Sequence, residues 1–294
     1  RQNLANLKNA GSLYGNIIYN KAPIMMRQLE ASMGKEMFQK GIQKYIQKYA
    51  NSNADWENLV EILDEETSLN IKKWSDVWVN QSGRALFTDH IEYDDAQTIR
   101  SFVIQQQAED GSLNVWPQIF EIGLVYPDTI KVIPVHVNSR ITELKEAIGL
   151  QKPISVIYNY NGYGYGVFPV DSNNLDKIPD IKDEVARAYS YINAYENTLT
   201  GKITAVKAFD VFVKGIAVEQ NELIVKLLSN QLSSIFWNFL NVKQQVVAQA
   251  ELELLLFNEL QAEIPSNVKK TIFGLFENIA YSKTGKEKLY QIWN

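Results

Sequence analysis

The stretch GNIIYNKAPIMMRQLE, residues 15–30, decides the fold that we predict for the start of the chain. The pair Ile17–Ile18 predicts a short β-rich run that leads into Tyr19. Pro23 predicts the first turn of a helix, because the N–H that proline lacks has no partner there, and Gly34 is a natural helix end. The apolar positions of this helix recur every fourth residue: Met25, Leu29 and Met33. We therefore expect Tyr19 at the entrance of a helix with one buried face.

The residues around Tyr19 also fit the motif I-x-Y-x-K, followed by G-x-x-x-F-x-x-G and a later tyrosine. The matching positions are Tyr19, Lys21, Leu29, Gly34, Phe38, Gly41 and Tyr45. This pattern resembles the aminopeptidase N family of zinc metallopeptidases, although Ala22-Pro23 stands where that family usually has Gly-Ala. The resemblance implies that Tyr19 is catalytic and donates a hydrogen bond to the oxyanion of the tetrahedral intermediate, which lowers the barrier by about 3 kcal/mol. The alternative is that Tyr19 only packs at a helix start and that Tyr14 or another group is the donor.

The same resemblance implies a zinc site made of His-Glu-x-x-His on a helix with a further Glu downstream. The chain has two histidines, His90 and His136, and neither lies in such a motif, so we expect both to be hydrogen-bonded structural residues. We therefore expect the zinc ligands upstream of Arg1. The 294 residues are then interpreted as the C-terminal portion of the enzyme, without a cofactor and inactive alone.

The amino-acid composition limits the kinds of partner that we expect for this protein. Hydrophobic residues make up 46% and charged residues 21% of the 294 residues, which is typical of a globular protein of two to three domains. The net charge is −5 without a Lys/Arg-rich run, so nucleic acid is not expected as a partner. No apolar stretch has the length of a membrane span. There is no cysteine, hence no disulfide or Cys-based metal site.

The expected fold class is multidomain and mainly α with a β-sandwich. By the resemblance, residues 1–88 form the helical end of a thermolysin-like catalytic domain. Residues 89–171 form a small antiparallel β-sandwich, and residues 172–294 form a C-terminal helical array of the HEAT or armadillo kind.

Apolar residues at helical spacing predict the helices of the first part, with Asn53 or Asp55 and then Asn70 as N-caps. Gly83 is expected to end the last of these helices, and the run 64–66, Asp-Glu-Glu, is expected to be a solvated surface. The residues that set the spacing are Phe38, Ile42, Tyr45, Ile46, Tyr49, Trp56, Leu59, Val60, Leu63, Ile71, Trp74 and Trp78.

From Thr88 the period changes to the alternation typical of strands. The alternating apolar residues are Ile91, Tyr93, Phe102, Ile104, Phe120, Ile122, Leu124, Ile133, Val135 and Val137. The Gly/Tyr segment, residues 157–171, resembles the last sandwich strand of the family, with Gly166 in place of an arginine. We expect its glycines to let a neighbouring backbone approach. The alternative is an aromatic platform that binds a polysaccharide or a peptide.

The remainder of the chain is predicted to be helical. Two stripes are expected to face inwards: Val185, Ala188, Tyr189 and Ile192, then Ala205, Ala208, Phe209 and Phe212. Further helices are expected over 222–228, 232–241, 245–263 and 267–280, with Pro265 and Gly285 as breaks. Glu251 and Glu253 are two residues apart and form a poor metal pair on a helix.

The sequence is thus interpreted as part of a zinc-dependent aminopeptidase that removes N-terminal residues from peptides. In that mechanism an upstream Glu is the general base for a zinc-activated water, and Tyr19 stabilises the oxyanion. The expected partners are the peptide substrate and the N-terminal catalytic portion of the same chain, in a bacterial-type cytoplasmic or periplasmic setting. A non-catalytic peptidase-like scaffold or protein-interaction module stays open. So does the family's epoxide-hydrolase branch, which lacks the sandwich and therefore disagrees with the β-pattern.

Overall fold

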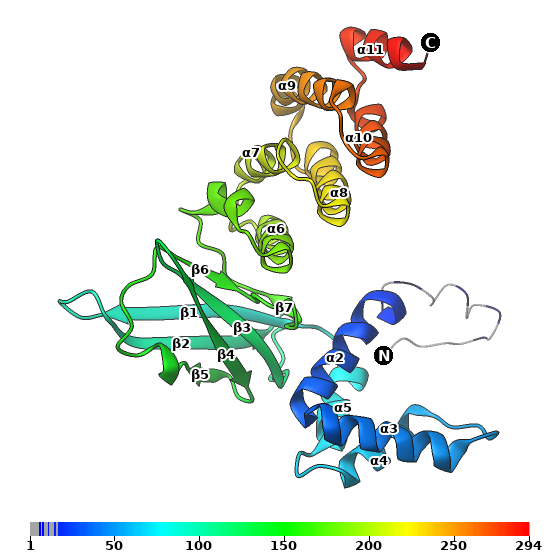
Figure 1. Cartoon of the computed structure of the whole chain (residues 1–294), viewed down its shortest axis with the longest axis vertical. Helices are drawn as coiled ribbons and strands as arrows, with labels where there is room; N and C mark the ends of the chain where they lie inside the picture. Colours follow the sequence, from blue (N-terminus) through cyan, green and yellow to red (C-terminus); the bar gives the residue numbers. More distant parts are fainter. Residues whose placement is uncertain (1–5, 7, 9–10, 12–14, 16, 294) are drawn as a thin grey trace. The chain divides into compact units, whose positions relative to one another are not determined.

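The computed structural model describes residues 6, 8, 11, 15 and 17–293, and the chain divides into two compact units, Arg1–Pro169 and Val170–Asn294 (Figure 1). Each unit has its own apolar core. In the first unit, helical and strand residues share one core. The division into three domains at residues 88 and 171 stays a prediction.

The first unit begins with helices and continues into strands. Its helical elements are η2 (Ile17–Lys21), α2 (Ala22–Met33), α3 (Lys35–Tyr49), α4 (Trp56–Glu65), α5 (Ile71–Ser75) and η3 (Asp76–Asn80), of which η2 and η3 are π-helical. The prediction for α2 is confirmed: Pro23 lies in its first turn and its every-fourth apolar residues are buried. Gly34 ends it with φ +83° and donates its N–H to the carbonyl of Glu30 at 2.9 Å.

The predicted β-rich run before Tyr19 is wrong, because Ile17–Lys21 is a π-helical turn that continues into α2. Pro23 gives the physical reason. Since it has no N–H, it cannot pair with the carbonyl four residues earlier, which belongs to Tyr19. A π turn pairs each carbonyl with the residue five positions on, and so moves that carbonyl past the proline.

Capping side chains and a glycine fix the next helices. Asp55 caps α4 in a reciprocal capping box with Asn58, and Asn70 caps α5 by accepting the N–H of Lys73 at 2.8 Å. Two expectations are wrong. Ile46 is 61% exposed, because α3 buries only a narrow side, and the last helix ends at Asn80, three residues before Gly83.

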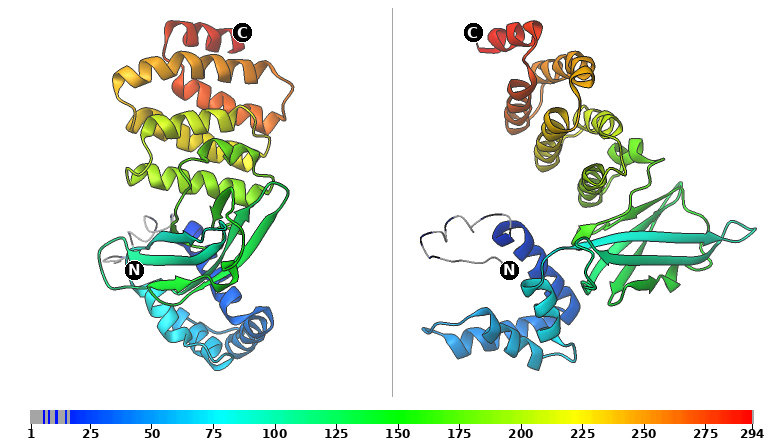
Figure 2. Two further views of the ribbon diagram at one scale, coloured as in Figure 1. Left: turned by 90° about the vertical axis from the view of Figure 1, so that its left-hand side faces the viewer. Right: turned by 180° about the vertical axis from the view of Figure 1, so that it is seen from behind.

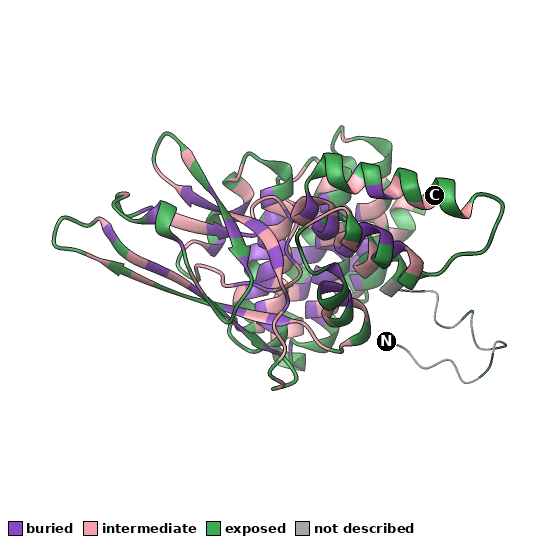
Figure 3. Ribbon diagram, turned by 90° about the horizontal axis from the view of Figure 1, so that it is seen from below, coloured by how far each residue is buried: buried purple, intermediate pink, exposed green. Residues whose placement is uncertain are grey.

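The strands of the first unit form two sheets. Their bounds are β1 (Ala85–Tyr93), β2 (Ile99–Ala108), β3 (Gln118–Val125), β4 (Ile130–Val137), β5 (Ile141–Glu143), β6 (Ser155–Tyr158) and β7 (Gly166–Val167). A 3-10 turn, η4 (Lys145–Ala147), follows β5. The strand orders are β5-β2-β1-β7 and β4-β3-β6. Burial alternates along β2, as expected for a strand with one face on a core (Figure 3).

The expectation of a fully antiparallel sandwich needs one correction, because β7 pairs in parallel with β1. The Gly/Tyr segment is also not a single strand. It leaves β6 in one sheet, crosses as a loop and joins the other sheet as β7. Gly166 confirms the expected close approach, since a Cβ there would lie 2.5 Å from the carbonyl oxygen of Ala85.

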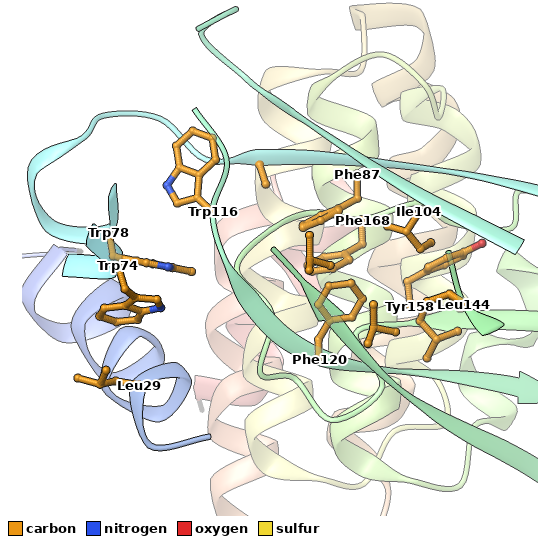
Figure 4. Packing of buried hydrophobic residues seen from close by; sticks show 14 of the residues in the cluster. Leu29, Trp74, Trp78, Phe87, Ile104, Trp116, Phe120, Leu144, Tyr158 and Phe168 are labelled. Atoms are coloured by element: carbon orange, nitrogen blue, oxygen red, sulfur yellow. The ribbon is translucent and has the colours of Figure 1, made fainter. Parts of the chain in front are cut away.

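Phenylalanines from both sheets meet in the core (Figure 4). Phe87 of β1 stacks on Phe168 with ring centroids 4.6 Å apart, and Phe120 of β3 meets both rings edge-on at 5.4 and 4.9 Å. All three side chains are at most 1% exposed. Contacts of this geometry join the two sheets into a small sandwich.

The second unit is a stack of helices in successive layers (Figure 2). Its elements are η5 (Leu175–Asp180), α6 (Glu184–Leu199), α7 (Ala205–Ile216), α8 (Glu222–Asn238), α9 (Val242–Gln261), α10 (Ser266–Ile279) and α11 (Lys283–Trp293). The helices predicted over 222–228 and 232–241 are one helix, α8. Gly285 does not break a helix. It lies inside α11, where a Cβ would meet the carboxylate of Glu253 at 2.6 Å.

The prediction of which face of α6 points inwards is wrong. Val185 is 47% exposed, and polar residues lie inside instead. Their side chains bond to the carbonyl four residues earlier in the same helix, which removes most of the cost of burying them. These bonds are Ser190 Oγ to Ala186 O at 2.8 Å, Asn197 Nδ2 to Asn193 O at 2.7 Å and Thr198 Oγ1 to Ala194 O at 2.9 Å.

Candidate functional site

Tyr19 lies in the π-helical turn η2, immediately before α2. Its backbone N–H donates to the carbonyl of Gly15 at 3.0 Å, and its side chain is 67% exposed. A phenol in this position can donate a hydrogen bond to a group outside the chain. Tyr14, the alternative donor, lies outside the described residues.

Gln28 fixes the helix that Tyr19 precedes. Its side chain is fully buried on the face of α2 that meets β3. Nε2 donates to the carbonyl oxygens of Ile119 and Tyr163, both at 2.6 Å, and Oε1 accepts the N–H of Ile119 at 2.8 Å. Three hydrogen bonds from one buried amide tie α2 both to a strand and to the Gly/Tyr segment. Because burial makes such bonds costly to lose, they fix the position of α2.

Two cations, one next to Gln28 in the chain and one at the end of the π turn, lie over tyrosine rings of the Gly/Tyr segment. The guanidinium of Arg27 is 5.3 Å from the ring centroid of Tyr163. The ammonium of Lys21, the last residue of the π turn, is 5.5 Å from the ring centroid of Tyr165. Burial lowers the pKa of the Lys21 ammonium below its usual value. A partly desolvated cation binds an aromatic face more strongly than a hydrated one.

The crossing loop that presents these rings is itself held by buried amides. Asn159, in the left-handed region at φ +56°, accepts the N–H of Gly164 at 2.7 Å and donates to its carbonyl at 3.1 Å. Gln118 does the same for Tyr165, at 2.8 and 3.2 Å. The loop is therefore a fixed surface, and its aromatic rings are partly covered by α2.

The two histidines lie at the surface, and a structural role for His136 stays a prediction. His90 Nε2 lies 3.2 Å from Glu92 Oε1 at the exposed surface of β1, and His136 is exposed on β4. Within the described residues no group of three His, Cys, Asp or Glu side chains could hold a metal ion. Over the same residues, no helix has the length and apolarity to traverse a bilayer.

The run at 64–66 is less solvated than expected. Asp64 Oδ1 accepts the N–H of Ile71 at 2.8 Å, at the start of α5, and Glu66 pairs with Lys40 at 2.8 Å and with Lys44. These carboxylates hold helices together and are satisfied within the chain.

Comparison with known proteins finds similarity to peptidases. The profile described as "Peptidase family M1 domain" matches residues 1–109, which include η2, α2 and the first two strands. Aminopeptidase N of Streptomyces lividans is 24% identical over 238 residues, 74% of this chain and 27% of that protein. Aminopeptidase M1-B of Oryza sativa subsp. japonica is 38% identical over 72 residues, 24% of this chain and 8% of that protein. Over residues 1–109 this chain therefore carries part of an M1 peptidase domain, and it is similar to aminopeptidases over most of its length.

The fold agrees with that similarity. The crystal structure of Legionella pneumophila aminopeptidase A in complex with aspartic acid superposes with a TM-score of 0.58 at 15% identity, covering 95% of this chain and 37% of that chain. The chain spans only 27% of the length of the Streptomyces relative. It has the fold of a mainly α, multidomain peptidase with small sheets.

Sequence reasoning found Tyr19 but not the amides that hold its helix. Gln28 lies between Arg27 and Leu29, three positions after Met25, and so falls on the apolar face of α2. A polar residue on such a face was the available signal. Its partners, Ile119 and Tyr163, are 91 and 135 residues away along the chain. No local pattern identifies contacts of that range.

Proposed function

We propose that these 294 residues act as part of a zinc-dependent aminopeptidase that removes N-terminal residues from peptides. The observation that carries this proposal is the exposed phenol of Tyr19 at the head of a helix whose far side is fixed by Gln28. The match of residues 1–109 to the M1 peptidase domain and the aminopeptidase relatives support the reaction class, and the peptide substrate is part of the proposal.

In this proposal the Tyr19 hydroxyl donates a hydrogen bond to the oxygen that becomes negative when the scissile carbonyl is attacked. A donor that is already in place stabilises this charge without reorganisation, and removing one such donor costs about 10²–10³ in kcat. The described residues do not form a zinc site, so the zinc ligands and the general base belong to other residues in the proposal.

The finer fold assignment is proposed on the same basis. The helices α2 to η3 correspond to the helical end of a thermolysin-like catalytic domain, the two sheets to the family's sandwich, and α6 to α11 to a HEAT- or armadillo-like array. The successive layers of helices in the second unit support the last assignment.

The test uses the full-length protein and aminoacyl-p-nitroanilide hydrolysis, with and without a chelator. Tyr19→Phe removes one hydroxyl and keeps the ring, and we expect kcat to fall by about 10²–10³. The matched control is Tyr290→Phe, at a tyrosine of similar exposure, 69% against 67%, in the second unit. We expect this control to keep the wild-type rate.

Wild-type activity in Tyr19→Phe would remove the catalytic role from Tyr19 and point to Tyr14 or another donor. No chelator-sensitive activity in the wild type would favour the non-catalytic scaffold. The isolated 294-residue chain, which contains no His-Glu-x-x-His, is expected to be inactive in the same assay. Hydrolysis by it would contradict the proposed division of the active site.

A further inference from the structure

In the turn that carries Tyr19, two neighbouring side chains are exposed. Ile18 and Tyr19 are 43% and 67% exposed, so their side chains constrain the turn only weakly. Lys21 ends the turn and is half-buried, with its ammonium over Tyr165. Lys21 is therefore one contact through which the turn, and with it the Tyr19 phenol, is held in place.

Tyr165 is itself held from several sides. Both polar groups of its peptide backbone bond to Gln118, at 2.8 and 3.2 Å. Its ring centroid lies 5.9 Å from that of Trp78, which is 1% exposed and donates Nε1–H to the carbonyl of Pro117 at 2.9 Å. Tyr165 is thus a fixed platform, supported by β3 and by the end of the helical part.

We propose that Tyr165 is a positioning residue for Tyr19, and that it acts through the Lys21 ammonium over its ring to hold the π-helical turn. This inference rests on the proposed catalytic role of Tyr19. It gives the sandwich a part in the reaction: the Gly/Tyr segment supports the turn that carries the donor. A misplacement of about 1 Å in a catalytic group can cost 100-fold in rate, so a contact at the end of the turn has a measurable effect.

The first experiment measures kcat and KM of the full-length enzyme for Tyr165→Leu and Tyr165→Phe. We expect kcat to fall about tenfold to thirtyfold in Tyr165→Leu, the change that corresponds to losing a partly desolvated cation–π contact, with KM within about twofold. Tyr165→Phe keeps the ring face and is expected to retain most of kcat. The matched control is Tyr93→Leu, which removes the ring 5.0 Å from the Lys152 ammonium in the same unit and is expected to leave kcat unchanged.

The second experiment combines Tyr165→Leu with Tyr19→Phe. If Tyr165 acts through the Tyr19 hydroxyl, the double variant has the kcat of Tyr19→Phe alone, because the hydroxyl to be positioned is gone. Lys21→Met removes the same cation–π contact by removing the ammonium, and it replaces Tyr165→Leu in the experiment if that variant does not fold. It is expected to match Tyr165→Leu in kcat and also to add nothing to Tyr19→Phe.

Three results would overturn the inference: wild-type kcat in both Tyr165→Leu and Lys21→Met, losses that multiply with that of Tyr19→Phe, or equal losses in Tyr165→Phe and Tyr165→Leu. The first two exclude action through Tyr19, and the third excludes the ring face. Failure of the proposed function gives a different result from failure of this inference: the single variant Tyr19→Phe would keep the wild-type kcat.

Discussion

The side-chain amide of Gln28 pairs with both backbone polar groups of Ile119: Nε2 donates to its carbonyl oxygen at 2.6 Å, and Oε1 accepts its N–H at 2.8 Å. This amide, which comes from helix α2, makes the two hydrogen bonds that a residue of a neighbouring strand would make with Ile119 of β3. It fixes both the distance and the rotation of α2, because both bonds are directional. The position of α2, the helix that follows Tyr19, is thus fixed by one polar side chain inside an apolar core.

Gln28→Met is expected to lower the free energy of unfolding of the first unit by about 3 kcal/mol. The substitution keeps the length of the side chain and leaves the buried polar groups of Ile119 and the carbonyl of Tyr163 without this partner, which costs about 1–3 kcal/mol for a buried group. Urea unfolding followed by tryptophan fluorescence measures the change. Gln43→Met, on the exposed side of α3, is the control and should shift the midpoint little. Equal shifts in the two variants would show that the buried amide contributes no more than a surface one.

Two glycines in helix interiors are expected to respond to alanine with opposite signs. A Cβ on Gly41 of α3 would lie 2.5 Å from Leu63 Cδ2, so Gly41→Ala forces α3 and α4 apart and costs about 1–2 kcal/mol. At Gly274 of α10 nothing lies within 4 Å of such a Cβ, and Gly274→Ala stabilises by about 0.5–1 kcal/mol through helix propensity. Calorimetry of both variants measures the two shifts. A stabilising Gly41→Ala would mean that Leu63 moves aside at no cost.

The buried pair of Arg187 and Glu219 makes the second unit sensitive to acid. Arg187 Nε lies 2.7 Å from Glu219 Oε2, and the two side chains are 12% and 5% exposed. Burial alone would raise the pKa of the Glu219 carboxyl. The bonds from Arg187 and from the N–H groups of Asn221 and Gln220 outweigh burial, and they hold the pKa below the usual 4.5.

A lowered pKa in the folded state means that the unfolded chain binds the proton more tightly. The stabilisation is therefore complete above about pH 5 and is lost as the pH falls below 4.5 and through the folded pKa. Glu219→Gln is expected to cost about 3 kcal/mol at neutral pH, since it leaves a buried guanidinium without its charge partner. Thermal unfolding should show this difference shrinking between about pH 6 and about pH 3. A difference that is constant with pH would exclude the Glu219 carboxyl as the titrating group.

Local signals were enough to predict α2. Pro23, the fourfold spacing of apolar residues and Gly34 all act within a few turns of the chain, and the structure confirms each of them. The same reasoning gave the wrong inward face for α6. It assumed that polar residues face solvent, whereas Ser190, Asn197 and Thr198 are satisfied by carbonyls of their own helix. Whether a polar side chain finds such a bond depends on its rotamer and neighbours, which spacing does not report.

The sequence by itself determined most of the helices, the alternating strands, and Tyr19 as a candidate donor ahead of a helix, because these depend on residues close together in the chain. Only the tertiary structure decided that the Gly/Tyr segment crosses between sheets, and that it lies against α2. Gln28 and Tyr163 are 135 residues apart, and their bond exists because two packed surfaces place an amide opposite a carbonyl. Contacts of that kind follow from the shape of the whole core, and no local period of the sequence records them.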